Sequence, residues 1–156
     1  MDRPIKKHNQ IHIRILKAGD VSDFIALIKV FEEVFEMKDL FIPEISHLRK
    51  ILSNKMINVF VAEYNGNIIG GATIYTLEQY YSTKPLAYIY DLAVLYEYQR
   101  KGVGTKIISE INEHFRSKGF DEVFVQADVI DKHAIEFYKS NHPTEEEDVK
   151  HFYFSF

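Results

Sequence analysis

Two glycines and two cations stand together in the run Gln99-Arg100-Lys101-Gly102-Val103-Gly104, where an apolar segment gives way to a helical pattern. A helix N-terminus leaves backbone N–H groups unpaired and carries the positive end of the helix dipole. Because glycine has no Cβ atom, such N–H groups can approach a ligand closely. The run favours binding of an anion, and a phosphate is the expected one. A plain strand-to-helix connection would use the same glycines.

Two aspartates stand in otherwise apolar stretches. Asp91 interrupts residues 86–95, and Asp128 ends the short run 122–128. A charge in a buried strand is costly unless it is paired or reached by solvent. A structural interpretation stays open for each: Asp91 as a partner of backbone N–H groups at a bulge, and Asp128 as a cap of the following loop. The alternative is that both carboxylates are functional.

Apolar periodicity predicts the elements that position these residues. Asn65-Gly66 between two apolar runs predicts a hairpin. Gly70-Gly71 indicates a bulge or a close approach of another backbone. Asp20 is expected to cap the first helix, Pro43 to open the second, and alternating aromatic residues predict a final strand. Strands are expected at 11–16, 57–64, 68–77, 86–95, 122–127 and 151–156, with a weak one inside 144–148, and helices at 21–35, 43–52, 103–118 and 131–142.

Composition sets the broad class. The chain has 156 residues, which suits one domain, expected over 11–156 after a flexible tail at 1–10. The absence of cysteine excludes disulfides, thiolate metal sites and cysteine nucleophiles. The net charge of −4 argues against a general nucleic-acid binder, and no apolar run has the length of a membrane span. We expect a cytoplasmic protein without a metal, whose His114 and His133 are exposed to solvent.

The run DLAVLYEYQRKGVGTKII resembles the acetyl-CoA-binding motif of the GCN5-related N-acetyltransferase (GNAT) superfamily, and DKHAIEFYKSN resembles the next block of that superfamily. Further segments are similar to type I aminoglycoside 3-N-acetyltransferases: IYDLAV, VQAD, a helix ending in FYK and an acidic segment leading to HF. The resemblance implies a GNAT-like acyl-CoA N-acyltransferase fold: one α/β domain with a mixed sheet, in the order β-α-α-β-β-β-α-β-α-β. Its fourth and fifth strands would splay apart around the pantetheine arm.

The implied activity is transfer of an acetyl group from acetyl-CoA to a primary amine, here the 3-amino group of an aminoglycoside such as gentamicin. Two alternatives stay open. In the first, the chain is a GNAT N-acetyltransferase whose acceptor is another small amine, a polyamine, or the N-terminus of a peptide or protein. In the second, the chain is a non-catalytic module that binds acyl-CoA. The expected partner is a cationic small-molecule amine, and a homodimer is compatible with the pattern.

The resemblance also implies roles for individual residues. Tyr138 would be the general acid at the cofactor sulfur, although a packed helix tyrosine would suit the same position. Asp91 and Asp128 would take the amine proton or bind the ammonium, and Asp131 stands where the superfamily usually has Asn. Glu36 and Glu145 would attract the cationic acceptor, unless they only belong to solvated faces. The residues implied in cofactor binding are Leu92, Ala93, Val94, Gln99, Arg100, Lys101, Gly102, Val103, Gly104, Thr105, Asp131, Ala134 and Tyr138.

Overall fold

The computed structural model describes residues 10–156, so most of the predicted tail lies outside the described residues. The chain forms two compact units, one up to Gln126 and one from Ala127 onward, and each is described by itself. The elements of the first unit are β1 (His12–Ile15), α1 (Val21–Val34), α2 (Ile45–Ser53), β2 (Ile57–Tyr64), β3 (Asn67–Leu77), β4 (Leu86–Val94), the 3₁₀ turn η1 (Tyr96–Tyr98), α3 (Val103–Ser117) and β5 (Glu122–Val125). The second unit contains α4 (Lys132–Ser140).

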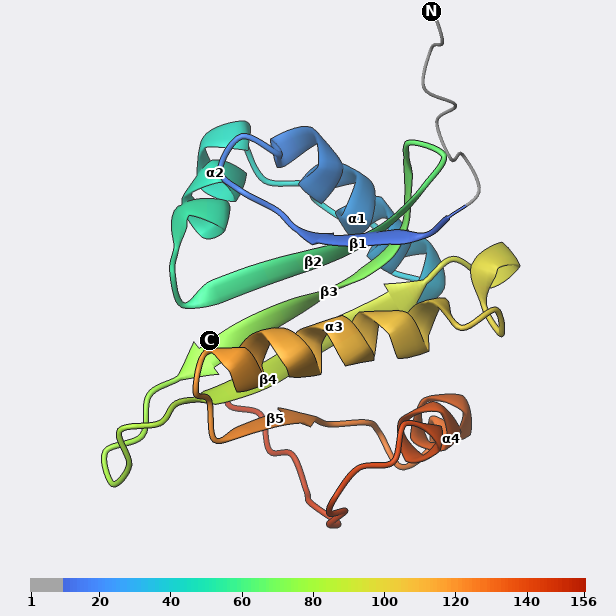
Figure 1. Cartoon of the computed structure of the whole chain (residues 1–156). Helices are drawn as coiled ribbons and strands as arrows, with labels where there is room; N and C mark the ends of the chain where they lie inside the picture. The colour runs from blue at the N-terminus through green and yellow to red at the C-terminus, as the bar shows by residue number, and fades with distance from the viewer. Residues whose placement is uncertain (1–9) are drawn as a thin grey trace, which may run out of the picture. The chain divides into compact units, whose positions relative to one another are not determined.

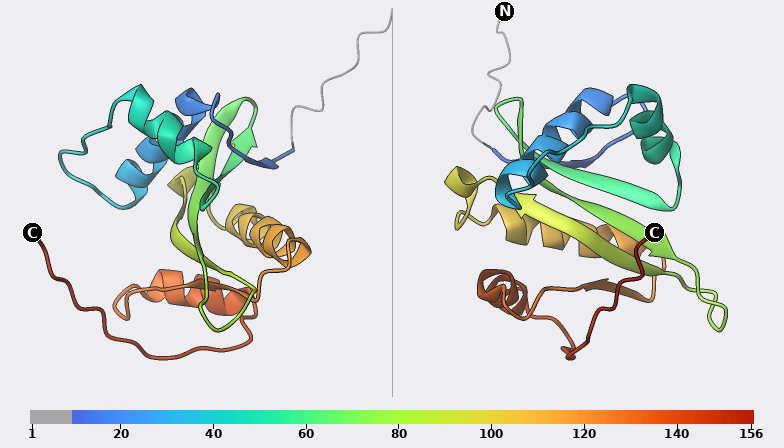
Figure 2. Two further views of the ribbon diagram at one scale, coloured as in Figure 1. Left: turned by 90° about the vertical axis from the view of Figure 1, so that its left-hand side faces the viewer. Right: turned by 180° about the vertical axis from the view of Figure 1, so that it is seen from behind.

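The first unit is built on a five-stranded sheet in the order β1-β2-β3-β4-β5. Neighbouring strands are antiparallel except β4 and β5, which are parallel. Helices α1 and α2 cover one face of this sheet and α3 covers the other (Figures 1 and 2). The mixed sheet and the fold class predicted from the sequence are confirmed.

Two glycine-dependent predictions for the sheet are confirmed. Asn65 and Gly66 both have positive φ, +50° and +80°, as a tight hairpin turn requires. Gly71 permits a close approach on both sides. An added Cβ there would lie 2.3 Å from the carbonyl oxygen of Phe60 and 2.7 Å from Leu27 Cδ1. Helix α1 therefore packs directly against the β3 backbone.

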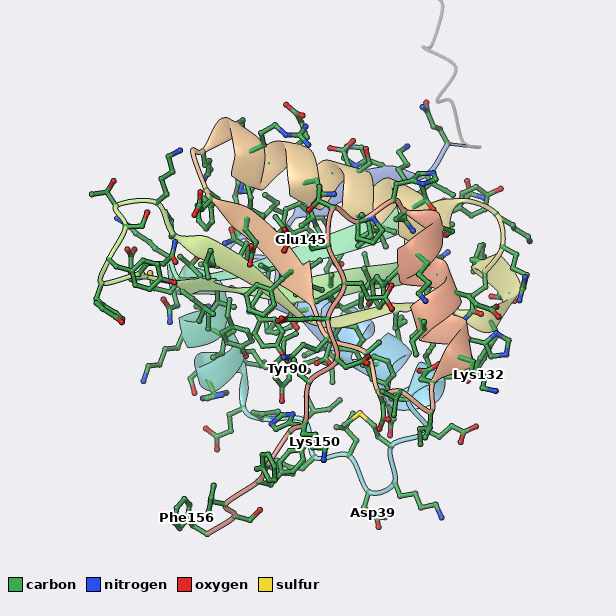
Figure 3. The ribbon with its side chains drawn as sticks, turned by 90° about the horizontal axis from the view of Figure 1, so that it is seen from below. Asp39, Tyr90, Lys132, Glu145, Lys150 and Phe156 are labelled. Carbon is green, nitrogen blue, oxygen red and sulfur yellow. The ribbon has the colours of Figure 1, made fainter. Side chains whose placement is uncertain are left out.

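The predicted C-terminal strand is not formed. Residues 141–156 of the second unit contain no strand, and the side chains of Phe152 and Phe154 are 74% and 85% exposed. Figure 3 shows Phe156 at the end of an extended segment. An alternating pattern specifies a face, but a strand also needs a backbone edge to pair with. Within the second unit α4 is the one regular element, and a helix offers no such edge.

Local details of three helices also differ from expectation. Helix α2 begins at Ile45, two residues after Pro43. The Asp20 carboxylate does not cap α1, because it accepts the N–H of Lys17 and lies 3.5 Å from Arg14. On α3, His114 is half-buried and its ring packs against Phe60 at a centroid distance of 5.5 Å. Within residues 10–156, no helix is both long and apolar enough to cross a membrane.

Candidate active site

The N-terminus of α3 has the geometry of an anion site. Gly102 is the N-cap and has φ +80°, a left-handed conformation that disfavours residues with a Cβ atom. The first helical hydrogen bond runs from Lys106 N–H to the Gly102 carbonyl at 3.0 Å. The N–H groups of Val103, Gly104 and Thr105 therefore have no acceptor within the helix. These three donors carry the positive end of a helix of 15 residues.

The turn before α3 is tied to the end of β4. Gln99 Nε2 donates to the carbonyl of Val94 at 2.8 Å, which holds the turn against the strand. Lys101 Nζ lies 5.8 Å from the ring centroid of Tyr98, within cation–π range. Arg100 is exposed and has φ +56°. Both cations therefore lie close in sequence to the unpaired N–H groups of the helix.

Strand β4 continues beyond the point where β5 pairs with it (Figure 1). The parallel ladder joins Leu86 to Glu122 and ends where Ile89 meets Val125. Beyond Ile89, β4 pairs with β3 alone as far as Val94. Strand β5 itself ends at Val125, so within the first unit the outer edge of β4 beyond Ile89 has no partner strand, and the splaying of the two strands around a pantetheine arm stays a prediction.

Alternation along β4 shows which backbone groups face this open edge. Leu95 N–H donates to the Ile69 carbonyl at 2.9 Å, so these two residues form a hydrogen-bonded pair. In an antiparallel pair every second residue forms such a hydrogen-bonded pair, so Ala93, two residues before Leu95, also points its N–H and C=O toward β3. Leu92 and Val94 point theirs the other way, where the Val94 carbonyl meets Gln99. Apart from the Val94 carbonyl, these outward backbone groups have no partner strand within the first unit.

Asp91 lies next to the same edge, at a β-bulge. Thr73 pairs with Asp91 while Ile74 pairs with Ile89, so Tyr90 is the extra residue. The Asp91 side chain is half-buried, and burial raises the pKa of its carboxyl group. Within residues 10–156, no opposite charge or hydrogen bond offsets that burial. The ionised carboxylate thus lacks a compensating partner, and a cationic ligand would supply one.

Thr73 is a neighbour of Asp91 that sequence patterning does not identify. The two residues face each other across β3 and β4, so their side chains lie on one face of the sheet. Thr73 Oγ1 is buried and has no hydrogen-bond partner within the described chain. Only the register of the strands reveals this pair, because Thr73 stands in an ordinary β-rich segment.

The second unit holds the remaining predicted residues. Asp128 Oδ1 accepts the N–H of Ile130 at 3.1 Å, and Asp131 Oδ1 accepts the N–H of Ala134 at 3.0 Å. Asp131 is therefore the N-cap of α4, as predicted. Tyr138 is half-buried on α4, with the ring of Phe137 at a centroid distance of 5.1 Å. Each of these residues has a structural role that does not exclude a functional one.

The two acids proposed from charge alone are both exposed. Glu36 follows α1 in the first unit and has φ +51°, while Glu145 lies in the segment after α4 (Figure 3). The neighbouring Glu146 forms an ion pair with Lys139 at 3.2 Å. Glu36 shares the first unit with Asp91, whereas Glu145 and Asp128 share the second.

The unpaired edge of β4 and helix α3, whose N-cap is Gly102, form the arrangement expected of an acyl-CoA-dependent transferase. The model of the acetyltransferase (GNAT) family matches residues 24–142. The chain belongs to this family, and the predicted class of N-acetyltransferases is confirmed.

Two solved structures are similar over nearly the whole chain. One is an aminoglycoside acetyltransferase, meta-AAC0020, from an uncultured soil metagenomic sample. Its complex with sisomicin is 51% identical, with a TM-score of 0.92 and coverage of 94% of this chain and 96% of that one. The other is the aminoglycoside acetyltransferase HMB0005, also from an uncultured soil metagenomic sample, at 29% identity, a TM-score of 0.86 and coverage of 94% and 99%.

A curated relative matches over a shorter stretch. It is an uncharacterized N-acetyltransferase from Chlorobaculum tepidum, 39% identical over 66 residues. The match covers 42% of this chain and spans 39% of the length of that relative.

Proposed function

We propose that the protein transfers an acetyl group from acetyl-CoA to an amine of an aminoglycoside, and that the acceptor is the 3-amino group. The observation that carries this proposal is the half-buried Asp91 carboxylate, which lacks a compensating charge beside the open edge of β4. The near full-length similarity to an aminoglycoside acetyltransferase solved with sisomicin supports the choice of acceptor. A cationic small molecule as partner and a cytoplasmic location belong to the same proposal.

The residues of the first unit fit acetyl-CoA, which supplies the acetyl group as a thioester when bound. The N–H groups of residues 103–105 would hold the pyrophosphate, assisted by Arg100 and Lys101. The backbone of Leu92 and Val94 would pair with the amides of the pantetheine arm, and Ala93 lies between them. Gly102 places no side chain at the helix N-terminus, and the space that a Cβ atom would occupy there is open, with no atom within 4 Å.

Asp91 has the properties that the acceptor amine requires. An ammonium has no lone pair, so it must lose a proton before it can attack a carbonyl carbon. A carboxylate without a partner attracts the ammonium, and a raised pKa makes it a better proton acceptor at neutral pH. General-base assistance of this kind is worth about 10²–10⁴-fold in rate.

Residues of the second unit supply further proposed roles. Tyr138 would donate a proton to the departing thiolate, a role that rests on its place in the family motif. Asp128 would assist the amine with the carboxylate oxygen that Ile130 does not use. Asp131 and Ala134 would contact the cofactor arm. Because the Asp131 carboxylate already caps α4, we expect its backbone rather than its side chain to make that contact.

Glu36 and Glu145 would attract the acceptor over a longer range. Aminoglycosides are polycations, and exposed carboxylates raise the local concentration of such a ligand in a manner that salt weakens. The net charge of −4 is consistent with this contribution.

Thiol release from acetyl-CoA tests the proposal. The acceptors are sisomicin, gentamicin, kanamycin, spermidine and a short peptide, and the chain has no cysteine that would add background. We expect fast release with sisomicin and gentamicin, and NMR of the purified product should show acetylation of the 3-amino group.

Other outcomes would change the proposal. Release with spermidine or the peptide alone would show that the acceptor is not an aminoglycoside. Tight acetyl-CoA binding without release would favour a binding module. The mass of the protein in solution shows whether it forms a homodimer, which the sequence allows but does not require.

A further inference from the structure

Four aromatic side chains form a row across three strands on one face of the sheet. Tyr75 on β3 is in register with Tyr88 on β4, and Tyr88 is in register with Phe124 on β5. The rings of Tyr88 and Phe124 stack at a centroid distance of 4.7 Å. Tyr90, two residues further along β4, meets Tyr75 at 5.6 Å and Tyr88 at 5.9 Å, edge to face in both cases. We call these four residues the aromatic row.

The aromatic row lies on the same face as Asp91. Thr73 and Tyr75 are two residues apart on β3, so their side chains share a face, and Asp91 stands opposite Thr73. The pKa of the Tyr75 phenol is raised by burial first, and then by the neighbouring Tyr90 and Asp91. The row and the carboxylate are therefore close enough to interact.

The two ends of the aromatic row differ. Tyr88 is anchored, since its ring stacks on Phe124 and its hydroxyl donates to Gln126 Oε1 at 3.2 Å. Tyr90 and Tyr75 leave 59% and 38% of their surface exposed, and Figure 3 shows where Tyr90 projects from β4. A row that only stabilised the sheet would gain most by covering these rings. Here the two rings nearest the carboxylate are the ones open to a ligand.

We propose that the aromatic row binds the ring of the acceptor that carries the reacting amine, and that Tyr75 and Tyr90 make this contact. The inference rests on the proposed function and names the residues that recognise its substrate. Aromatic faces attract cations within about 6 Å of the ring centroid, and they also bury the C–H face of a saturated ring. Asp91, on the same sheet face, holds the ammonium group itself. Together they recognise a ring that carries a positive charge.

The test combines steady-state kinetics with calorimetry, using sisomicin as the probe. Tyr90→Ala and Tyr75→Ala should each raise KM and the calorimetric Kd for sisomicin about tenfold, which corresponds to about 1.4 kcal/mol. We expect kcat and the Kd for acetyl-CoA to stay within about twofold. Tyr90→Phe should retain most of the affinity because it keeps the ring. The matched control is Tyr80→Ala, which removes a tyrosine that is 99% exposed and lies outside the row.

The outcomes separate this inference from the proposed function. If the wild-type protein acetylates sisomicin but both alanine variants bind it as tightly, the aromatic row has no part in recognition. A lower melting temperature with unchanged Kd would likewise assign the row to sheet stability alone. Should the wild-type protein neither bind nor acetylate sisomicin, the proposed function fails, and this inference fails with it. Variants that melt like the wild type and lose affinity for sisomicin alone would support it.

Discussion

Substitution of Asp91 by Asn removes a charge while keeping the shape of the side chain. We expect kcat/KM for sisomicin to fall about 10²–10⁴-fold, because an amide neither accepts a proton nor attracts an ammonium as a carboxylate does. The wild-type rate should also decline on the acidic side at a higher pH than an ordinary aspartate would give, since burial raises the pKa of this carboxyl group. In Asp91→Asn that acidic limb should disappear.

The same substitution should stabilise the fold. The folded-state pKa of Asp91 is raised, so the folded protein resists ionisation of this group and loses stability as pH rises through that pKa. The cost of the unpaired charge is fully present only at pH values above the raised pKa. Because solvent screens part of this half-buried charge, its removal is worth at most about 1 kcal/mol. For a chain of 156 residues this corresponds to a rise of about 2–4 °C in Tm.

The Asp91→Asn variant should therefore have a lower kcat/KM and a higher Tm than the wild type. Thiol release at several pH values measures kcat/KM, and calorimetric melting at pH 7 measures Tm. Asp121→Asn is the control, because Asp121 is an exposed aspartate before β5 and should change neither quantity. The reasoning is refuted if Asp91→Asn retains kcat/KM within threefold, or if its Tm falls, since the carboxylate would then be held by a partner.

Three further predictions follow from single residues. Gly102→Ala should lower stability by about 1–2 kcal/mol because Gly102 has a φ of +80°, and it should also weaken acetyl-CoA binding. Gly66→Ala, at a hairpin residue with the same φ, should lower stability alone. Calorimetry measures the stability and the acetyl-CoA affinity of each variant. Tyr138→Phe should lower kcat more than it changes the Kd for acetyl-CoA, and an unchanged kcat in thiol release would exclude the general-acid role. Burial and then Lys118 lower the folded-state pKa of His114 below its ordinary value of 6.5. The protein should therefore lose stability as the pH falls from 6.5 toward the lowered pKa. His114→Leu should reduce the difference in Tm between pH 7 and pH 5.

Features that depend on adjacent residues could be predicted from the sequence. The glycine run locates the N-terminus of α3, because a left-handed N-cap requires a residue such as Gly102. Asn65-Gly66 locates the hairpin between β2 and β3 for the same reason. Asp131 caps α4 as its position before the helix implies. In each case the physical cause acts within a few residues, so a local pattern contains the information.

Features that depend on pairing between strands could not be predicted in this way. The bulge at Tyr90 decides which β4 residues share a face, and it is defined only by the register with β3. The aromatic row needs that register and also the pairing of β4 with β5. The C-terminal residues illustrate the converse error, since Phe152 and Phe154 alternate like a strand but have no paired edge within their unit.

The comparison of Asp91 with Asp128 shows how the structure refines a choice that the sequence leaves open. Asp91 interrupts an apolar run and Asp128 ends one, so in the sequence the cost of burying a charge suggests a functional role for either residue. In the structure Asp128 gives one carboxylate oxygen to Ile130 N–H and is exposed, which is sufficient to explain an aspartate at that turn. Asp91 has no such compensation and its pKa is raised by burial. Because no charge or hydrogen bond within residues 10–156 compensates Asp91, we propose a cationic ligand as its partner, and Asp91 is the residue to substitute first.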